Sequence, residues 1–170
     1  MLDVANSLYE EIRVDLVRWL TGARRFIVLG VGNELRGDDA VGVLVARSLK
    51  RFNGERFEAV ECGVSLEACV GYALEKRPSH LLIVDAFPDG KRLMLLDLTD
   101  LESRTPVSTH AIPLPLLLNA FGQPLEANIK MLGIGVENFK LGTIVSDEYR
   151  EVAEKVARAI RVAAAALSLL

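Results

Sequence analysis

The chain has 170 residues, which is long enough for one domain with a hydrophobic core. Its 51% hydrophobic and 25% charged residues are typical of a globular protein and exclude intrinsic disorder. The formal net charge of −3 argues against a protein that binds nucleic acid.

The predicted helices and strands alternate along the chain. Each is recognised from apolar residues at helical spacing or from a short apolar run between turn residues. In chain order we expect a helix over 2–21, a strand over 25–31, a helix over 39–52, a strand over 57–62, a helix over 65–77, strands over 81–85 and 92–96, a short helix over 113–121, a strand over 129–136 and a long helix after Ser146. Ser65 and Ser146 stand where helix N-caps are expected, and Gly22 ends the first helix.

This alternation indicates an α/β fold with a mostly parallel sheet of five strands. Only the strand over 92–96 follows its predecessor through a short connection, so it is the one expected to run antiparallel. If the first three strands take the order 2-1-3, the first and third end side by side, at a point where open α/β sheets bind ligands. No repeat or linker divides the chain, so we expect a single domain over 1–170, with 1–22 as an extra N-terminal helix.

The cysteines and the termini indicate the compartment. No apolar run is long enough to span a bilayer, so we expect no membrane insertion. The N-terminus is acidic where a signal peptide would be basic. Cys62 and Cys69 lack CxxC spacing, and reduced thiols in or near the core are their simplest interpretation. Together these features predict a cytoplasmic protein.

Polar residues gather at the expected meeting point of the first and third strands. Asp38 and Asp39 follow the first strand, Asp85 ends the third, and His110 lies in a later segment. An aspartate that closes an apolar strand is costly to bury without a partner. Asp39, Asp85 and His110 together form a donor set that suits a borderline divalent metal with open positions. Spacing alone therefore predicts a metal-linked or hydrolytic α/β enzyme.

Each candidate also has an ordinary structural interpretation. Asp38 and Asp39 are both suited to cap or begin a helix, and a single histidine is more often structural than a ligand. The other histidine, His80, looks like a surface residue at the start of the third strand. The glycines of 30–32 resemble the start of a dinucleotide loop, but Leu35 stands where that motif needs its third glycine.

Several sequence blocks resemble those of the hydrogenase maturation endopeptidases. They read GVGNELRGDDAVG over 30–42, LLIVDA over 81–86, THAIPL over 109–114 and LGI over 132–134. The blocks occur in the order found in that family, and the resemblance extends over residues 26–165. They look most similar to the branch that processes hydrogenase-3-like, membrane-associated evolving hydrogenases.

The resemblance implies a three-layer α/β/α fold with a twisted, mostly parallel five-stranded sheet. It also implies an endopeptidase that removes the C-terminal extension of a nickel-loaded hydrogenase large-subunit precursor. The family's three nickel-contacting residues fall on Asp39, Asp85 and His110. The nickel is then contributed by the substrate and is not resident in the free enzyme, and the precursor is the expected partner.

Two features depart from the family pattern. The turn over 62–65 keeps only Gly63 of a glycine pair, and the N-terminal helix over 2–21 lies outside the pattern. That helix is expected to pack on the sheet or to serve a dimer contact.

The expected chemistry is metal-licensed peptide hydrolysis. The substrate's nickel gains ligands from the enzyme and polarises the scissile carbonyl or supplies the attacking water. Asp38 is a candidate catalytic base, and a capping role is the alternative. Neither Gly-x-Ser-x-Gly nor His-Glu-x-x-His occurs, so serine chemistry and a resident zinc are not supported.

Two functions from other classes remain open at this stage. One is a non-catalytic nickel-binding or chaperone module for hydrogenase assembly, which would share the three ligands without cleaving anything. The other is a nucleotide- or small-molecule-binding α/β domain, which would need a phosphate cradle.

Overall fold

The computed structural model describes residues 2–88, 90, 92–97 and 127–170, with side chains from residue 7 onward. Its elements are α1 (Leu2–Trp19), β1 (Phe26–Val31), η1 (Gly37–Ala40), α2 (Val41–Leu49), η2 (Lys50–Phe52), β2 (Phe57–Gly63), α3 (Leu66–Glu75), β3 (His80–Phe87), β4 (Leu93–Asp97), β5 (Asn128–Gly135) and α6 (Asp147–Ala166). The expected helix over 113–121 and His110 lie outside the described residues.

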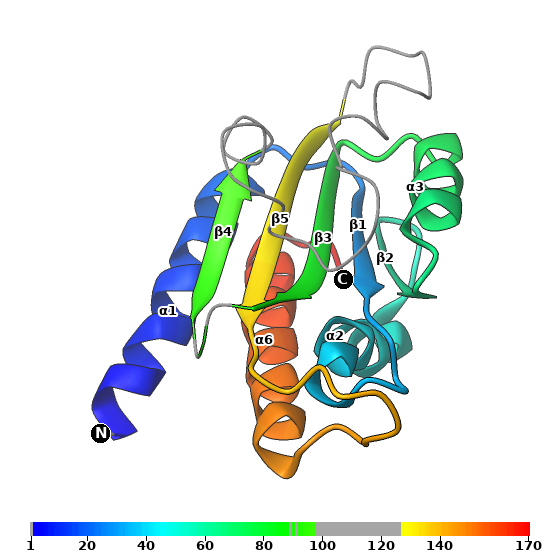
Figure 1. Cartoon of the computed structure of the whole chain (residues 1–170). Coiled ribbons are helices and arrows are strands. Elements are labelled where there is room, and N and C mark those ends of the chain that lie inside the picture. The colour runs from blue at the N-terminus through cyan, green and yellow to red at the C-terminus, as the bar shows by residue number, and fades with distance from the viewer. Residues whose placement is uncertain (1, 89, 91, 98–126) are drawn as a thin grey trace.

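The five strands form one sheet in the order β2-β1-β3-β5-β4 (Figure 1). β1 pairs in parallel with β2 and β3, and β3 pairs in parallel with β5. β4 runs antiparallel to β5, as its short connection predicted. The expected 2-1-3 order of the first three strands is confirmed, and the carboxyl ends of β1 and β3 lie side by side.

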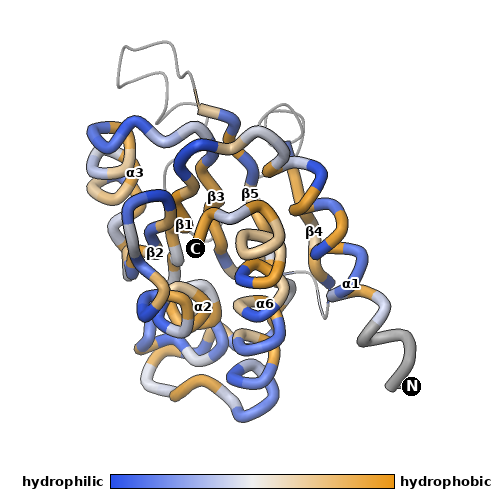
Figure 2. Tube along the Cα trace, turned by 180° about the vertical axis from the view of Figure 1, so that it is seen from behind, coloured by the Kyte–Doolittle hydropathy of each residue, from blue (hydrophilic) through white to orange (hydrophobic). Residues whose placement is uncertain are grey.

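Helices cover both faces of the sheet. α1, α2 and α6 share one core cluster with Phe26 and Val28 of β1. α3 shares the other with Ile27 and Leu29, because successive side chains of a strand point to opposite faces. The three-layer α/β/α arrangement is therefore confirmed. Figure 2, seen from behind, shows α2 and α6 side by side on the first face.

The burial of β3 explains why its sequence is an almost continuous apolar run. All eight of its residues are buried, since it has a neighbouring strand on each side and a layer on each face. Asp85 is the single acidic residue within it and is 0% exposed.

The N-terminal helix packs into the molecule as the first alternative predicted. Ile12, Leu16 and Leu20 are buried in the core cluster that α6 shares. The ring of Trp19 lies 5.9 Å from that of Phe26 and 5.1 Å from that of His80, both edge to face. The end of α1 thus covers the amino ends of β1 and β3.

The prediction that His80 is a surface residue is wrong. Its exposed fraction is 4%, because Trp19 covers it and it starts a central strand. Its ring nitrogens lie 3.2 Å from Ser79 Oγ and 3.4 Å from Asn128 Nδ2. Burial lowers the pKa of His80 below its usual value.

The caps of the later helices agree in part with the sequence. Ser146 caps α6, since its Oγ accepts a hydrogen bond of 3.4 Å from the Tyr149 amide. Ser65 occupies the N-cap position of α3 without a side-chain hydrogen bond. Across the described part of the chain, none of the helices combines the length and the hydropathy needed to cross a bilayer.

Candidate active site

The start of α2 sits directly on the carboxyl ends of β1 and β3. A Cβ on Gly42 would overlap the carbonyl oxygens of Val31 and Val84, one from each strand. A Cβ on Gly30 would in turn overlap the Gly42 carbonyl oxygen. Glycine at these positions lets the helix approach the sheet closely, so that η1, which precedes the helix, contacts β3.

Asp39 lies in η1 beneath the loop that follows β1. Its side chain is buried, and its Oδ2 accepts a hydrogen bond of 3.0 Å from the Asn33 amide. Gly32 has a φ of +152°, and a Cβ there would overlap the Asp39 carbonyl oxygen. The loop therefore wraps closely around Asp39.

Asp85 stands one residue beyond Val84, the last residue of β3 that pairs with β1. Its Oδ1 accepts a hydrogen bond of 2.8 Å from the Ala86 amide. Asp85 and Asp39 therefore lie at the same edge of the sheet, as the sequence predicted. Both are buried rather than open to solvent.

Asp38 has a different environment from its neighbour. Its Oδ1 accepts a hydrogen bond of 2.8 Å from the amide of Ser146, the cap residue of α6. Its exposed fraction is 4%. The carboxylate thus joins η1 to the start of α6. It does not cap its own helix, which was the alternative that the sequence had left open, because it lies within η1 and α2 has no side-chain cap.

The third expected ligand, His110, lies outside the described residues. Within the described part of the chain, no three histidine, cysteine, aspartate or glutamate side chains are grouped so that they could hold a metal ion. The described members of the expected donor set are Asp39 and Asp85.

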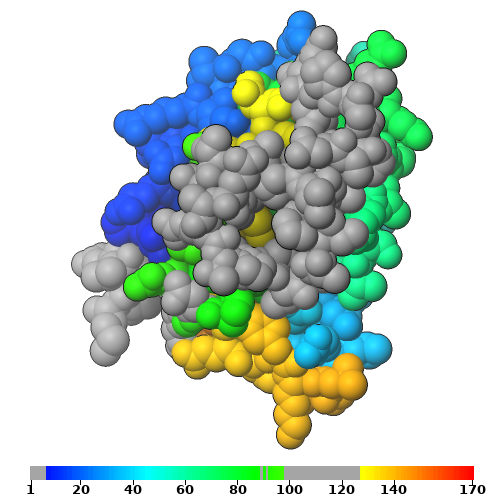
Figure 3. All heavy atoms as spheres, turned by 45° about the horizontal axis from the view of Figure 1, so that its top comes forward, coloured from blue at the N-terminus to red at the C-terminus, as the bar shows by residue number. Residues whose placement is uncertain are grey.

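A second loop supports the site, and sequence reasoning did not single it out. Thr143 O accepts a hydrogen bond from the Gly37 amide, and Asn138 O accepts one from the Asp38 amide, both at 2.9 Å. Gly37 has a φ of +60°, and a Cβ there would press on the side chains of Asn138 and Thr143. The turn signals around Gly142 were the available clue. Figure 3 shows the loop after β5 beside the first loop.

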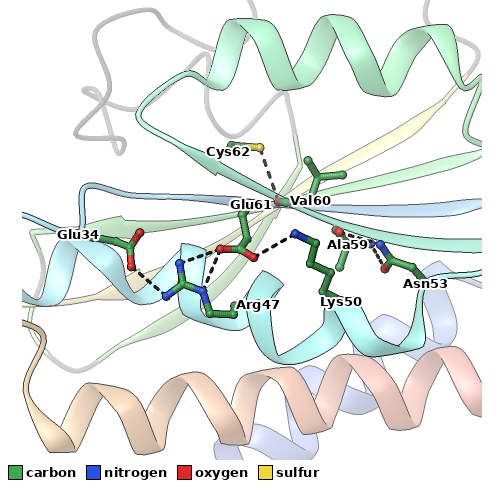
Figure 4. A network of polar contacts seen from close by, with 8 residues as sticks. All are labelled: Glu34, Arg47, Lys50, Asn53, Ala59, Val60, Glu61 and Cys62. Atoms are coloured by element: carbon green, nitrogen blue, oxygen red, sulfur yellow. Dashed lines mark hydrogen bonds and ion pairs between the residues drawn. The ribbon is translucent and has the colours of Figure 1, made fainter.

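A surface ion-pair network braces the same loop from its other side (Figure 4). Arg47 of α2 contacts Glu34 at 2.9 Å and Glu61 of β2 at 2.7 Å, and Lys50 lies 3.5 Å from Glu61. The hydrogen bond from Arg47 lowers the pKa of Glu34. These exposed pairs contribute little stability, but they connect the first loop to α2 and β2.

The turn between β2 and α3 completes this edge. Its Gly63 carbonyl accepts a hydrogen bond of 2.9 Å from the Gly32 amide, which ties the turn to the first loop. The expectation of reduced cysteines is wrong here, because Cys62 and Cys69 form a disulfide with Cα atoms 5.7 Å apart. The first turn of α3 folds back over the end of β2 and brings the two together. Their placement close to the core is confirmed, with exposed fractions of 8% and 9%.

A large groove lies away from these residues. It has a volume of about 740 Å³, lies between α1, the end of β5 and α6, and is not lined by Asp39 or Asp85. Tyr149 lines it and donates a hydrogen bond of 2.8 Å to the Gly135 carbonyl. Burial raises the pKa of Tyr149 to about 12, so this hydroxyl stays protonated at neutral pH.

Comparison with known proteins agrees with the motif resemblance. The chain is 29% identical over 126 residues to a Methanocaldococcus jannaschii protein whose name describes a hydrogenase maturation protease, covering 68% of this chain and 74% of that protein. It is also 29% identical over 111 residues to the hydrogenase 3 maturation protease of Escherichia coli K12, covering 64% of this chain and 70% of the relative. No protein-family profile matches the chain.

Solved structures give the same answer for the fold. The NiFe hydrogenase maturation protease HycI from Thermococcus kodakarensis superposes with a TM-score of 0.72 at 28% identity, covering 86% of this chain and 98% of that chain. The hydrogenase maturating endopeptidase HybD from Escherichia coli superposes with a TM-score of 0.66 at 24% identity. The superposition covers 85% of this chain and 92% of HybD, and it supports the fold alone.

The fold and the comparisons identify an α/β enzyme of the peptidase class. More narrowly, the chain is a homologue of the hydrogenase maturation proteases in both sequence and fold.

Proposed function

We propose that this protein is an endopeptidase that removes the C-terminal extension from a nickel-loaded hydrogenase large-subunit precursor. One observation carries the proposal. Two buried aspartates, Asp39 and Asp85, lie at the carboxyl edge of a sheet whose fold and motifs are similar to those of hydrogenase maturation proteases. The relatives are described as hydrogenase maturation proteases, which supports a hydrogenase precursor as the substrate.

The donor chemistry supports recognition of the substrate's nickel. Carboxylate and imidazole donors suit a borderline divalent ion, and a set of two carboxylates and one histidine leaves coordination positions open. The precursor would fill those positions with its own soft ligands. Asp39, Asp85 and His110 are the residues of this chain proposed to contact the nickel, which would arrive with the precursor.

An open set of three ligands holds a metal less firmly than a closed cage of four cysteines or histidines. The free enzyme is therefore proposed to carry little or no metal. Cleavage then reports that nickel insertion is complete, because the enzyme binds productively only through the metal already in the substrate.

The test compares nickel-loaded and nickel-free precursor. We expect cleavage, seen as a mass shift on a gel, only for the loaded precursor, and less than stoichiometric metal in the purified enzyme. The variants Asp39→Asn, Asp85→Asn and His110→Ala should abolish cleavage with retained circular dichroism spectra. The control is Asp15→Asn, an exposed aspartate of α1, which should cleave at the native rate. Efficient cleavage of nickel-free precursor by an enzyme with chelator-resistant metal would overturn the proposal.

The second candidate is a non-catalytic nickel-binding or chaperone module, which would use the same donor pair. It predicts a stable complex with loaded precursor and no change in precursor mass. A nickel-dependent complex without cleavage, under conditions in which a related protease cuts its own precursor, would favour this candidate.

We also propose a cytoplasmic location, where large-subunit maturation would take place. The disulfide between Cys62 and Cys69 is uncommon in that compartment, although intracellular proteins of hyperthermophiles are an exception. Trapping thiols in intact cells, followed by mass spectrometry, would show whether the pair is oxidised where the protein works.

A further inference from the structure

α2 and α6 lie side by side (Figure 2), and residues of α2, η2 and α6 line a basic groove. It has a volume of about 400 Å³, which is the size of a site for a small molecule. η1 leads into the first turn of α2 at the candidate active site, whereas the groove lies at the last turn of α2 and at η2. The groove is therefore separate from the carboxyl edge of the sheet.

One aromatic ring organises the groove. The guanidinium carbon of Arg51 lies 5.0 Å from the centre of the Phe52 ring, and that of Arg161 lies 5.6 Å from the same centre. Such stacking is favourable and limits the orientations of both side chains. Two guanidinium groups from distant parts of the chain are thus anchored to the same ring before any ligand binds.

These cations have no carboxylate partners among the residues that the structure describes. Within the described part of the chain, Arg51, Arg158 and Arg161 form no ion pair, although all three line the groove. The two acidic side chains of the lining have other partners within it. Glu151 pairs with Lys155 at 2.7 Å, and Glu154 accepts a hydrogen bond of 2.6 Å from Ser48.

The charge of the groove is opposite to that of the protein. Four cationic side chains and two carboxylates line it, a surplus of two positive charges, whereas the whole chain has a net charge of −3. Guanidinium groups bind phosphate oxygens in a bidentate manner, and an anion with two or more charges would match this surplus.

We propose that this groove binds a small phosphate-type anion with two or more negative charges, held by Arg51, Arg158 and Arg161. The stacked ring of Phe52 acts as a positioning residue for two of them. The inference goes beyond the proposed proteolysis and does not depend on it, because binding is measured directly on the isolated protein.

Inorganic pyrophosphate is the ligand for the test, titrated into the protein by calorimetry at about 0.15 M salt, where long-range attraction between exposed charges is screened. We expect saturable one-to-one binding. Arg51→Gln and Arg161→Gln should each weaken it about tenfold, in line with the loss of one charge-assisted contact. Phe52→Leu keeps every charge and should also weaken binding, because the two guanidinium groups lose their common support.

The matched control is Arg150→Gln, an exposed arginine of α6 outside the groove, which should leave the affinity unchanged. Circular dichroism confirms that each variant is folded. Absence of saturable binding would overturn the proposal. An equal loss of affinity in Arg150→Gln and Arg161→Gln would also overturn it, since it would mean only general attraction to a charged surface.

Discussion

Asp38 and Asp39 are adjacent in the sequence but have separate structural roles. Asp39 accepts a hydrogen bond from the loop after β1, whereas Asp38 accepts one from the Ser146 amide at the start of α6. In a 3-10 helix, neighbouring side chains project in different directions. The carboxylate of Asp39 therefore faces the loop, while that of Asp38 faces a helix more than a hundred residues away in the chain.

Asp38→Ala should therefore destabilise the protein by about 1–3 kcal/mol, because the partly buried Ser146 amide loses its acceptor. Asp38→Asn, which keeps an acceptor oxygen, should be milder and should retain measurable cleavage of loaded precursor. Urea denaturation and the gel assay measure the two effects. An Asp38→Asn protein of native stability with no cleavage would instead assign Asp38 to the chemistry.

The buried His80 predicts a pH dependence of stability. Its folded-state pKa is lowered by burial, so below the usual value of about 6.5 the unfolded chain takes up a proton that the folded chain does not. The free energy of unfolding should fall as the pH drops from 7.5 towards 5.5. In His80→Gln this part of the slope should be absent, which urea titrations at several pH values would reveal. Identical slopes in both proteins would contradict it.

At the scale of elements, three loops meet at one edge of the sheet. The loop after β1 is bonded to the turn after β2 through Gly32 and Gly63, and to the loop after β5 through Gly37 and Thr143. Positive φ angles at Gly32, Gly37 and Gly63 permit these connections. The position of Asp39 thus depends on contacts between segments far apart in the sequence.

The disulfide is the covalent part of this edge. It closes a short loop, with a sequence separation of 7 between Cys62 and Cys69, for which chain entropy gives about 2–3 kcal/mol of stability. Cys69→Ser, or treatment with a dithiol reductant, should lower the free energy of unfolding by that amount. The double variant Cys62→Ser/Cys69→Ser should lose no more in reductant, which serves as the control. Equal stability with and without reductant would show that the bond adds nothing.

At the scale of the whole molecule, α1 is an integral part of the larger core. Leu16 is 0% exposed and lies in the cluster shared by α1, α2, α6 and the sheet. Helix and sheet therefore stabilise each other, although α1 lies outside the motifs that resemble the family.

Leu16→Ala should lower the free energy of unfolding by about 2–5 kcal/mol, because it leaves a cavity under α1. Val14→Ala, at a position 39% exposed on the same helix, is the control and should cost much less. Thermal or urea unfolding gives both values. Similar small losses in the two variants would mean that α1 contributes little to the fold.

The sequence by itself determined the type and order of the elements, the antiparallel β4 and the edge of the sheet near which Asp39 and Asp85 lie. Periodicity, glycine and proline signals act over a few residues, and parallel connections restrict the topology, so these features can be inferred without coordinates. The boundaries within 39–52 were less accurate, because the chain starts as η1 and ends as η2 around α2.

Only the tertiary structure decided which polar residues are buried and with whom they pair. The burial of His80 depends on Trp19, the role of Asp38 on Ser146, and the disulfide on how α3 folds back over β2. The arginines around Phe52 likewise come from η2 and α6, which adjoin only after folding. The reason is physical: such contacts are set by the packing of whole elements, and no pattern of a few neighbouring residues records them.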